Sequence, residues 1–272
     1  MSNSLQSTEA TNIIEGNSEY KNLSETIIYT TKSGESELYV VERESFRGEK
    51  GKYRFLRFDK GGYLGGINLI NPNYNIFSYI RNMLDIAENM RKEAKEFYMI
   101  GHGVGSITKA LNSQWKRITV AELDENILKL SKQYFDYQGE NVIIGDGRGI
   151  LERKRDNSLD VIFIDAFLRE IIPNHLTSKE FFTLAKRKNT DNGIVVMNVM
   201  GKINSDSLAQ SIFGTISNIY PEVKVFAKHQ EVDRVQNLIF VSSQSPLPNV
   251  SLSEVKEVRV QCGEIIIDDV KR

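Results

Sequence analysis

Apolar residues follow two different periods along this chain, and the change of period divides it into two parts. Between Thr26 and Leu69, short runs rich in β-branched and aromatic residues alternate with polar turns. These runs are residues 27–29, 38–41, 53–58 and 63–64, and Asp59-Lys60-Gly61-Gly62 has the composition of a hairpin turn between the last two. We therefore expect a small antiparallel β-domain over residues 23–75.

A helical period begins at Ile76. Apolar side chains at 76, 79, 80, 83, 84, 86 and 87 form one stripe, which predicts a helix over residues 76–91. From Phe97 onward strand-like and helix-like segments alternate. The expected helices are residues 106–112, 125–137, 148–154, 178–187 and 207–219, and the expected later strands are 193–199, 223–226 and 238–242. This alternation predicts an α/β domain over residues 76–248 with a doubly wound, mostly parallel, Rossmann-like sheet. The polar link between the last two strands is compatible with a hairpin, which would make one strand antiparallel.

The two ends of the chain have a different composition. Residues 1–22 are rich in Ser, Asn, Thr and Glu, which is typical of a disordered tail. Residues 249–272 read as a C-terminal extension, in which Glu264–Ile267 is compatible with an edge strand.

Four strand ends carry the residues that are suited to chemistry. The strand Tyr98–Ile100 runs into the glycine loop Gly101–Gly105, and three later strands end on Glu122, Asp146 and Asp165. Ligands of open α/β sheets bind in the crevice at the carboxyl ends of the strands. We therefore expect these groups to meet there, forming a nucleoside site with one acid left for chemistry.

The glycine loop indicates the kind of nucleoside. Gly101, Gly103 and Gly105 allow a sharp turn and a close approach of the backbone to a ligand, to which His102 would contribute its backbone. The dinucleotide pattern G-x-G-x-x-G needs a glycine where this chain has Ser106, which disfavours a nicotinamide-dependent oxidoreductase. The loop fits a nucleoside without a pyrophosphate, and the alternative is a tight turn that binds no ligand.

Two of the acids are candidates for holding the nucleoside. Glu122 can accept hydrogen bonds from both ribose hydroxyls, and Leu123 beside it can pack on adenine. Asp146, followed by Gly147, can accept the adenine amino group. The alternatives are a solvated acid at a helix start for Glu122 and a helix N-cap for Asp146.

Asp165 is the candidate for chemistry. A carboxylate at the end of a buried strand is costly unless it is paired or functional. It can orient an amine and take its proton, because an alkylamine with a pKa near ~10.4 must lose a proton before it attacks. The alternative is a capping acid. The loop Leu168–Thr177, which contains His175, is expected to cover this site, and Asn198 ends a strand at the same edge.

Composition excludes some classes of function. The net charge is −1, from 35 basic and 36 acidic residues, which argues against binding nucleic acid or membrane by charge alone. Cys262 is the only cysteine, and three scattered histidines make no metal set, so we expect no metal. No apolar run approaches the roughly 18 residues of a membrane span, and no signal pattern is visible. We expect a cytoplasmic protein.

Taken together, the motifs resemble the spermidine synthase family, whose fold is of the class I methyltransferase type. The resemblance lies in residues 77–79, 100–105, 121–124, 145–147 and 163–165 and in the β-domain before them. It implies an enzyme of polyamine biosynthesis, typically a dimer or tetramer, that transfers an aminopropyl group from decarboxylated S-adenosylmethionine to an amine. It also implies that Glu122 binds ribose, Asp146 binds adenine, Asp165 is the catalytic acid–base residue and Tyr79 contacts the amine.

The chain departs from the family pattern at three polar positions. Val104 stands where the family has an aspartate that helps to bind the aminopropyl ammonium, and Ile80 replaces a polar residue. Asp165-Ala166-Phe167-Leu168 lacks the family's second aspartate. The segments 165–167, 172–177 and 180–182 are more similar to a divergent branch that is often fused to membrane transporters.

These observations lead to one expectation with open alternatives. We expect a transferase that uses S-adenosylmethionine or its decarboxylated form as co-substrate and acts, as a homodimer, on a small amine, with Phe167 and His175 near the substrate. Val104 and Leu168 favour methyl transfer, whereas the family resemblance favours aminopropyl transfer. The rivals are a non-catalytic or regulatory adenosyl-nucleoside-binding protein and a nucleic-acid methyltransferase, and the near-zero net charge disfavours the latter.

Overall fold

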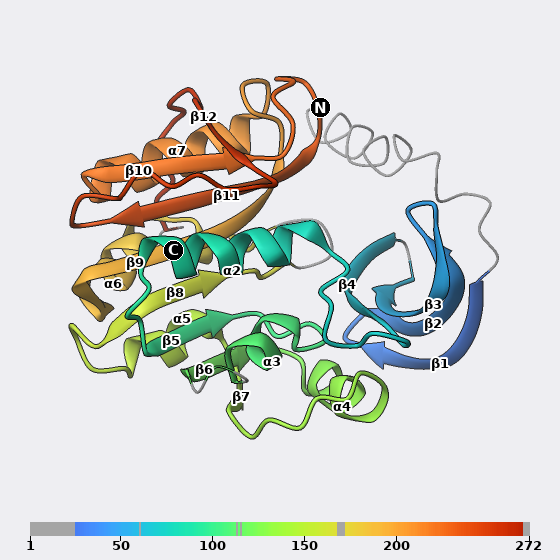
Figure 1. Cartoon of the computed structure of the whole chain (residues 1–272). Coiled ribbons are helices and arrows are strands. Elements are labelled where there is room, and N and C mark those ends of the chain that lie inside the picture. Colours follow the sequence, from blue (N-terminus) through green and yellow to red (C-terminus); the bar gives the residue numbers. More distant parts are fainter. Residues whose placement is uncertain (1–24, 60, 113, 115, 168–171, 269–272) are drawn as a thin grey trace, which may run out of the picture. The chain divides into compact units, whose positions relative to one another are not determined.

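The computed structural model describes residues 25–59, 61–112, 114, 116–167 and 172–268. The chain forms two compact units, the first ending at Ile76 and the second beginning at Phe77 (Figure 1). The expected tail, residues 1–22, lies outside the described residues, as does the part of the expected covering loop from 168 to 171.

The first unit is a four-stranded antiparallel sheet. Its strands pair in chain order as β1 (Glu25–Ser33), β2 (Ser36–Phe46), β3 (Glu49–Phe58) and β4 (Gly61–Asn68). Phe46, Tyr53 and Phe55 pack their rings together on this sheet. The Glu25 carboxylate on β1 accepts hydrogen bonds from Arg43 and Arg57 on β2 and β3. The small antiparallel sheet expected from the sequence is therefore confirmed.

The second unit alternates helices and strands as expected. Its first half comprises α2 (Ser78–Met90), β5 (Glu96–Ile100), α3 (Ser106–Asn112), β6 (Arg117–Glu122), α4 (Glu125–Tyr134), β7 (Val142–Ile144), α5 (Gly147–Glu152) and β8 (Leu159–Ile164). The second half comprises η2 (Asn174–Leu176), α6 (Lys179–Lys188), β9 (Asn189–Gly201), α7 (Ser207–Ile219), β10 (Glu222–Ala227), β11 (Gln236–Ser243) and β12 (Lys256–Val258).

The eight strands of this unit form one mixed sheet in the order β12-β10-β11-β9-β8-β5-β6-β7. Neighbouring strands from β9 to β7 are parallel, whereas β11 is antiparallel to both β9 and β10, so the hairpin considered from the sequence is present. This is the expected doubly wound, mostly parallel sheet. Its order reverses beside β5, because β6 pairs on one side of β5 and β8 on the other.

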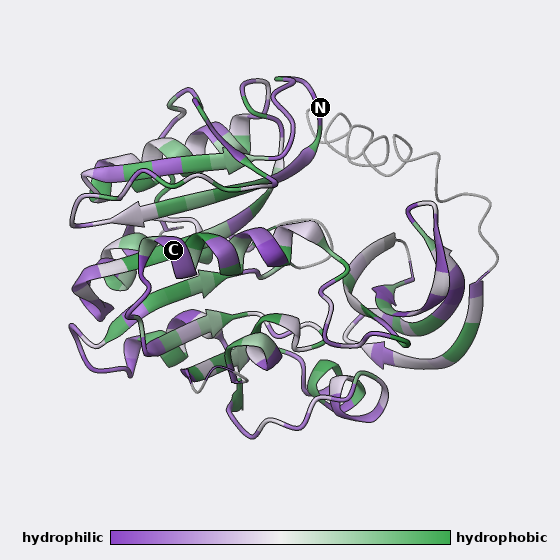
Figure 2. Cartoon of the chain, in the orientation of Figure 1, coloured by the Kyte–Doolittle hydropathy of each residue, from purple (hydrophilic) through white to green (hydrophobic). Residues whose placement is uncertain are grey.

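The central strands are buried on both faces, which explains their nearly continuous apolar sequences. Ile162 and Ile164 of β8 belong to a core cluster with Phe181 of α6. On alternate positions, Phe97 of β5 stacks on Phe163 of β8, with ring centroids 6.2 Å apart. Figure 2 shows β8 as hydrophobic along most of its length. Helices α5, α6 and α7 pack in succession, and α2 packs on α3, so the helices form two groups.

Two elements differ from expectation. Helix α4 ends at Tyr134 instead of Tyr137, because Asp136 takes a left-handed conformation with φ of 54°. The possible strand at 264–267 is absent. The backbone N–H of Ile266 donates instead to Thr215 Oγ1 of α7, and its carbonyl accepts from the N–H of Lys179 on α6, so the segment uses its hydrogen-bonding groups on helices. The edge strand is β12, three residues paired with β10.

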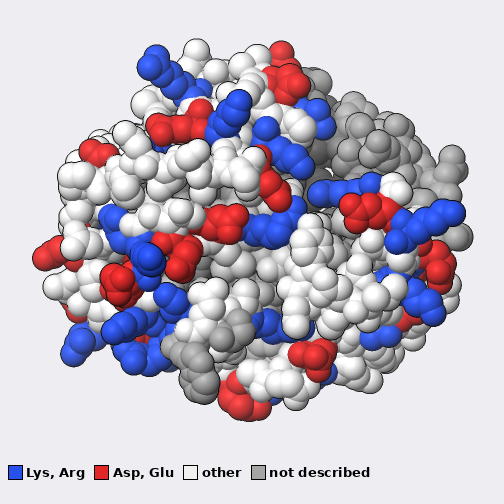
Figure 3. All heavy atoms as spheres, viewed as in Figure 1, with Lys and Arg blue, Asp and Glu red and all other residues white. Residues whose placement is uncertain are grey.

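Two surface properties bear on possible partners. Basic and acidic side chains are interspersed on the face shown in Figure 3, with no large field of one sign. Within the described ranges, each helix is too short or too polar to cross a lipid bilayer.

The glycine at the end of β5 yields a test of the fold. An added Cβ at Gly101 would lie 2.2 Å from the carbonyl oxygen of Asp165, and the residue has φ of +94°. We expect Gly101→Ala to destabilise the protein by at least about 1–3 kcal/mol from the backbone conformation alone. Gly149→Ala is the control, because its added Cβ would meet only Asp146 Oδ1 at 3.5 Å within a helix. It should be neutral or slightly stabilising in denaturant unfolding, and equal effects of the two changes would contradict the argument.

Candidate active site

The glycine loop lies at the point where the strand order of the large sheet reverses. Gly101, Gly103 and Gly105 all have positive φ, at 94°, 55° and 82°. The N–H of Gly101 donates to Ala121 at the end of β6, and the N–H of Asp165 donates to Ile100 at the end of β5. The loop therefore runs directly against the backbone of Asp165, at the crevice where open α/β sheets bind ligands.

Glu122 connects the glycine loop to the end of β6. Its Oε2 accepts from the backbone N–H of His102 at 2.9 Å, and its Oε1 accepts from the N–H of Asp124 at 3.0 Å. The side chain is only 7% exposed, so it is not a solvated acid at a helix start. Burial raises the pKa of this carboxyl group, although the backbone hydrogen bonds act to lower it. A third backbone hydrogen bond comes from Leu123, so one of the four lone-pair sites of the carboxylate is left for a further donor, such as a hydroxyl.

The ring of His102 anchors the glycine loop on α4, a role that the sequence did not reveal. Its Nε2 lies 2.8 Å from Ser131 Oγ, and that hydroxyl donates its own hydrogen to the carbonyl of Leu128. The Ser131 oxygen must therefore accept, and Nε2 carries the hydrogen. Burial lowers the pKa of His102 to about 4, so the ring is neutral near pH 7. The edge of the ring also packs on Tyr137, with centroids 4.5 Å apart.

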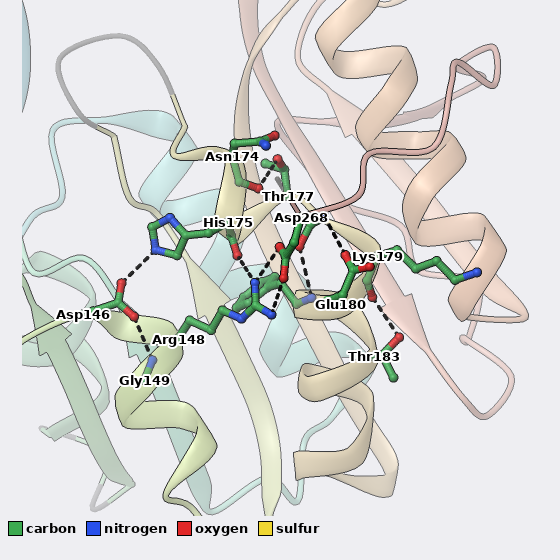
Figure 4. A network of polar contacts seen from close by, with 12 residues as sticks. Asp146, Arg148, Gly149, Asn174, His175, Thr177, Lys179, Glu180, Thr183 and Asp268 are labelled. Carbon is green, nitrogen blue, oxygen red and sulfur yellow. Dashed lines mark hydrogen bonds and ion pairs between the residues drawn. The ribbon is translucent and has the colours of Figure 1, made fainter. Parts of the chain in front are cut away.

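Asp146 is the N-cap of α5, the alternative that the sequence left open. Its Oδ1 accepts from the N–H of Gly149 at 2.8 Å, and its Oδ2 lies 2.8 Å from His175 Nε2 (Figure 4). Burial acts to raise the pKa of Asp146, but these hydrogen bonds and the positive charge of Arg148 lower it. The carboxylate is about half exposed, so a ligand can also reach it.

Residues beside the two acids differ in exposure. Leu123 is 61% exposed and Ile144 42% exposed, which leaves apolar surface next to Glu122 and Asp146 where a flat base could pack. Gly147 serves close packing, because an added Cβ would lie 2.4 Å from Cγ2 of Ile100. Its carbonyl accepts a hydrogen bond from Tyr98.

Asp165 follows β8 and receives hydrogen bonds from two neutral groups. Tyr79 Oη donates to Oδ2 at 3.2 Å, and Asn198 Nδ2 donates to Oδ1 at 2.8 Å. Burial raises the pKa of Asp165, and the two hydrogen bonds partly oppose this shift. Burial and the nearby Asp165 carboxylate raise the pKa of Tyr79 well above its usual value, so its hydroxyl remains a donor. Asp165 as a whole residue is nevertheless partly exposed.

Asn237 extends this group and was missed by sequence reasoning. Its Nδ2 donates to Asn198 Oδ1 at 3.0 Å, and Asn198 Nδ2 donates in turn to Asp165. The two amides therefore form a chain of hydrogen bonds that ends on the Asp165 carboxylate. Asn198 itself was noted from the sequence as the end of a strand. The only sequence signal for Asn237 is its place as a polar residue just before the apolar run of β11. This signal is weak because Asn198, its partner, is 39 residues away and the pairing of β11 with β9 brings the two together.

Other predicted residues fall around Asp165 or apart from it. Val104 in the glycine loop is 2% exposed, and Phe167 is partly buried against the core. His175, expected near the substrate, contacts Asp146 instead of Asp165. Over the described ranges, no group of three or more His, Cys, Asp or Glu side chains is arranged to hold a metal ion.

Comparison with known proteins identifies the family of the chain. The sequence model of the Spermine/spermidine synthase domain matches residues 76–230, more than half of the chain. A polyamine aminopropyltransferase from Vibrio vulnificus is 27% identical over 236 residues, which cover 82% of this chain and 74% of that protein. A "probable polyamine aminopropyl transferase" from Bifidobacterium longum is 31% identical over 149 residues. The match covers 50% of this chain but only 33% of the Bifidobacterium protein.

Two further similarities bear on the fold and on the activity. An N-terminal histidine N-methyltransferase from Emericella nidulans is 32% identical over 165 residues, covering 57% of this chain and 29% of that protein. The crystal structure of a probable spermidine synthase from Corynebacterium glutamicum superposes with a TM-score of 0.70 at 22% identity, covering 81% of each chain. This structure shows a shared fold. Because the family model matches more than half of its residues, the chain belongs to the spermine/spermidine synthase family.

Proposed function

We propose that this chain is a transferase that moves the aminopropyl group of decarboxylated S-adenosylmethionine to a small amine. The observation that carries the proposal is Asp165, a carboxylate held by Tyr79 and Asn198 directly beside the glycine loop. The family membership and the aminopropyltransferases among its relatives support the choice of group.

The residues of the crevice fit an adenosyl sulfonium. Glu122 offers a remaining lone-pair site for a ribose hydroxyl, and Asp146 offers a half-exposed carboxylate for the adenine amino group. The exposed face of Leu123 offers apolar surface for the base. Glycine at 101 and 105 lets the loop turn with positive φ and pack closely on Asp165 and Tyr137.

The proposed reaction is an in-line displacement. The sulfonium supplies an electrophilic carbon and leaves as a neutral thioether that keeps the electron pair of the broken C–S bond. Asp165 accepts the proton of the attacking amine, whose nitrogen forms the new C–N bond. Tyr79 and Asn198 fix the orientation of the carboxylate, and the remaining contribution of the protein is to hold the two reactants in line.

Methyl transfer from S-adenosylmethionine is the second candidate. The specific observation in its favour is Val104, a buried apolar residue in the glycine loop where the family pattern places an aspartate for the aminopropyl ammonium. A buried ammonium without a partner carboxylate is costly. The Emericella relative is a methyltransferase, which shows that proteins similar to this chain include that chemistry.

Calorimetry with four nucleosides tests the proposal and separates the two candidates. We expect decarboxylated S-adenosylmethionine and methylthioadenosine to bind more tightly than S-adenosylmethionine and S-adenosylhomocysteine. The reverse order would favour the methyltransferase. If none of the four binds, the nucleoside site is wrong.

Replacement of Asp165 tests its catalytic role. We expect Asp165→Asn to lower kcat by about 10²–10⁴, the usual contribution of a positioned base, with little change in nucleoside affinity. Asp191→Asn, at an exposed carboxylate near the start of β9, is the matched control and should leave turnover unchanged. Turnover by Asp165→Asn at the rate of the unaltered chain would exclude Asp165 as the base.

The pH profile tests the hydrogen bonds to Asp165. Because burial raises the pKa of Asp165, activity should fall on the acid side at a pH above the ordinary aspartate value of about 3.9. The Asn198 amide stabilises the ionised form, so Asn198→Ala should raise the pKa further and move the acid limb to higher pH. Comparing the two proteins with the same amine cancels the titration of the substrate. An acid limb at the same pH in both would show that Asn198 does not act on Asp165.

A further inference from the structure

A connected network of polar contacts joins Asp268 in the C-terminal segment to Asp146 (Figure 4). Asp146 is the N-cap of α5, and Arg148 lies in the first turn of the same helix. Asp146 Oδ2 contacts the His175 ring at 2.8 Å, while Arg148 Nη1 donates to the His175 carbonyl at 3.1 Å. His175 is thus held through both its ring and its backbone by the same helix start.

Asp268 fixes the arginine that holds His175. The Arg148 guanidinium donates to both carboxylate oxygens of Asp268, with both distances 2.7 Å. Such bidentate pairs restrict the orientation of the guanidinium as well as its position. Asp268 also accepts from the Ser178 hydroxyl, and its backbone N–H donates to Glu180 Oε2 at 2.9 Å. It is therefore fixed at the junction where the His175 loop enters α6.

The segment that carries Asp268 is itself anchored on the helices. The N–H of Gly263 donates to Gln210 on α7, and Ile266 bonds to both Thr215 and Lys179. An added Cβ at Gly214 would lie 2.5 Å from the carbonyl oxygen of Gly263, so the segment packs directly on α7. These contacts set the place of Asp268 independently of Arg148.

The contact of His175 with Asp146 needs this support. Both side chains are nearly half exposed, and exposed polar contacts between mobile side chains contribute little by themselves. Asp146 is ionised, because its pKa is lowered, so it can only accept, and His175 Nε2 must donate. The His175 ring then lies beside the carboxylate that is proposed to accept an adenine amino group.

We propose that Arg148 and Asp268 are positioning residues that hold the His175 ring against Asp146, so that the C-terminal segment sets the affinity of the site for the base of a nucleoside. This inference rests on the proposed function, because Asp146 faces the base only if a nucleoside binds there. The ligand class is a nucleoside whose base carries an exocyclic amino group.

The test uses a pair of matched variants and methylthioadenosine as the probe. Arg148–Asp268 and Arg81–Glu254 are ion pairs of equal exposure, with side chains 24% and 33% exposed in the first and 23% and 33% in the second. We expect Asp268→Asn to raise the calorimetric Kd about three- to tenfold, within the range of measured coupling between neighbouring sites. Glu254→Gln should leave the Kd unchanged.

A double-mutant cycle distinguishes positioning from a general structural role. His175→Ala should raise the Kd by itself, and Asp268→Asn should add no further increase in the His175→Ala background. An equal increase in both backgrounds, or a Kd for Asp268→Asn equal to that of the unaltered chain, would overturn the inference.

A second measurement needs no ligand. The chain has three histidines, so the ¹⁵N signals of the His175 ring can be assigned by single substitutions. We expect an Nε2–H tautomer in the unaltered chain and a mixture of tautomers in Asp268→Asn. If methylthioadenosine does not bind the unaltered chain, the proposed function fails and with it the effect on the base. A His175 signal that Asp268→Asn leaves unchanged would overturn the positioning of the ring itself.

Discussion

The close approach of two backbones at the strand-order reversal is the constraint on which the rest of the site depends. Gly101 ends β5 with positive φ, and an added Cβ there would overlap the carbonyl of Asp165 after β8. The glycine loop can therefore lie against the chain that carries the catalytic candidate. Since β5 and β8 are adjacent and parallel, their sheet hydrogen bonds hold this approach in register.

Three acids at neighbouring strand ends acquire different properties from different partners. Glu122 is buried and accepts hydrogen bonds from backbone N–H groups. One of these groups belongs to His102, so Glu122 stabilises the glycine loop. Asp146 caps a helix and stays half exposed, and its pKa is lowered. Asp165 receives bonds only from neutral donors among its described contacts, and burial raises its pKa. A group intended to take up a proton gains from a pKa closer to the working pH, whereas groups that only bind do not need it.

Two features of the chain favour different transferred groups. Membership of the spermine/spermidine synthase family favours an aminopropyl group, whereas the apolar glycine loop favours a methyl group. The family match and the similarity to a polyamine aminopropyltransferase favour aminopropyl transfer. Val104 is buried and offers no charge to an ammonium. Around His175, the segment after β12 contacts Arg148 through Asp268, and Arg148 in turn holds the His175 backbone.

The sequence by itself determined the elements and the order of the acids. Apolar periodicity revealed the alternation of strands and helices. A residue that ends a strand, such as Glu122, or directly follows one, such as Asp165, lies at its carboxyl end in any parallel sheet. Only the tertiary structure decided which polar groups meet. Asn237 reaches Asn198 through an antiparallel pairing, His102 reaches Ser131 across a helix, and Asp268 reaches Arg148 from 120 residues away. Local patterns carry no information about such contacts, because the packing of distant segments sets them. For the same reason Glu264–Ile267, though apolar enough for a strand, bonds to helices instead.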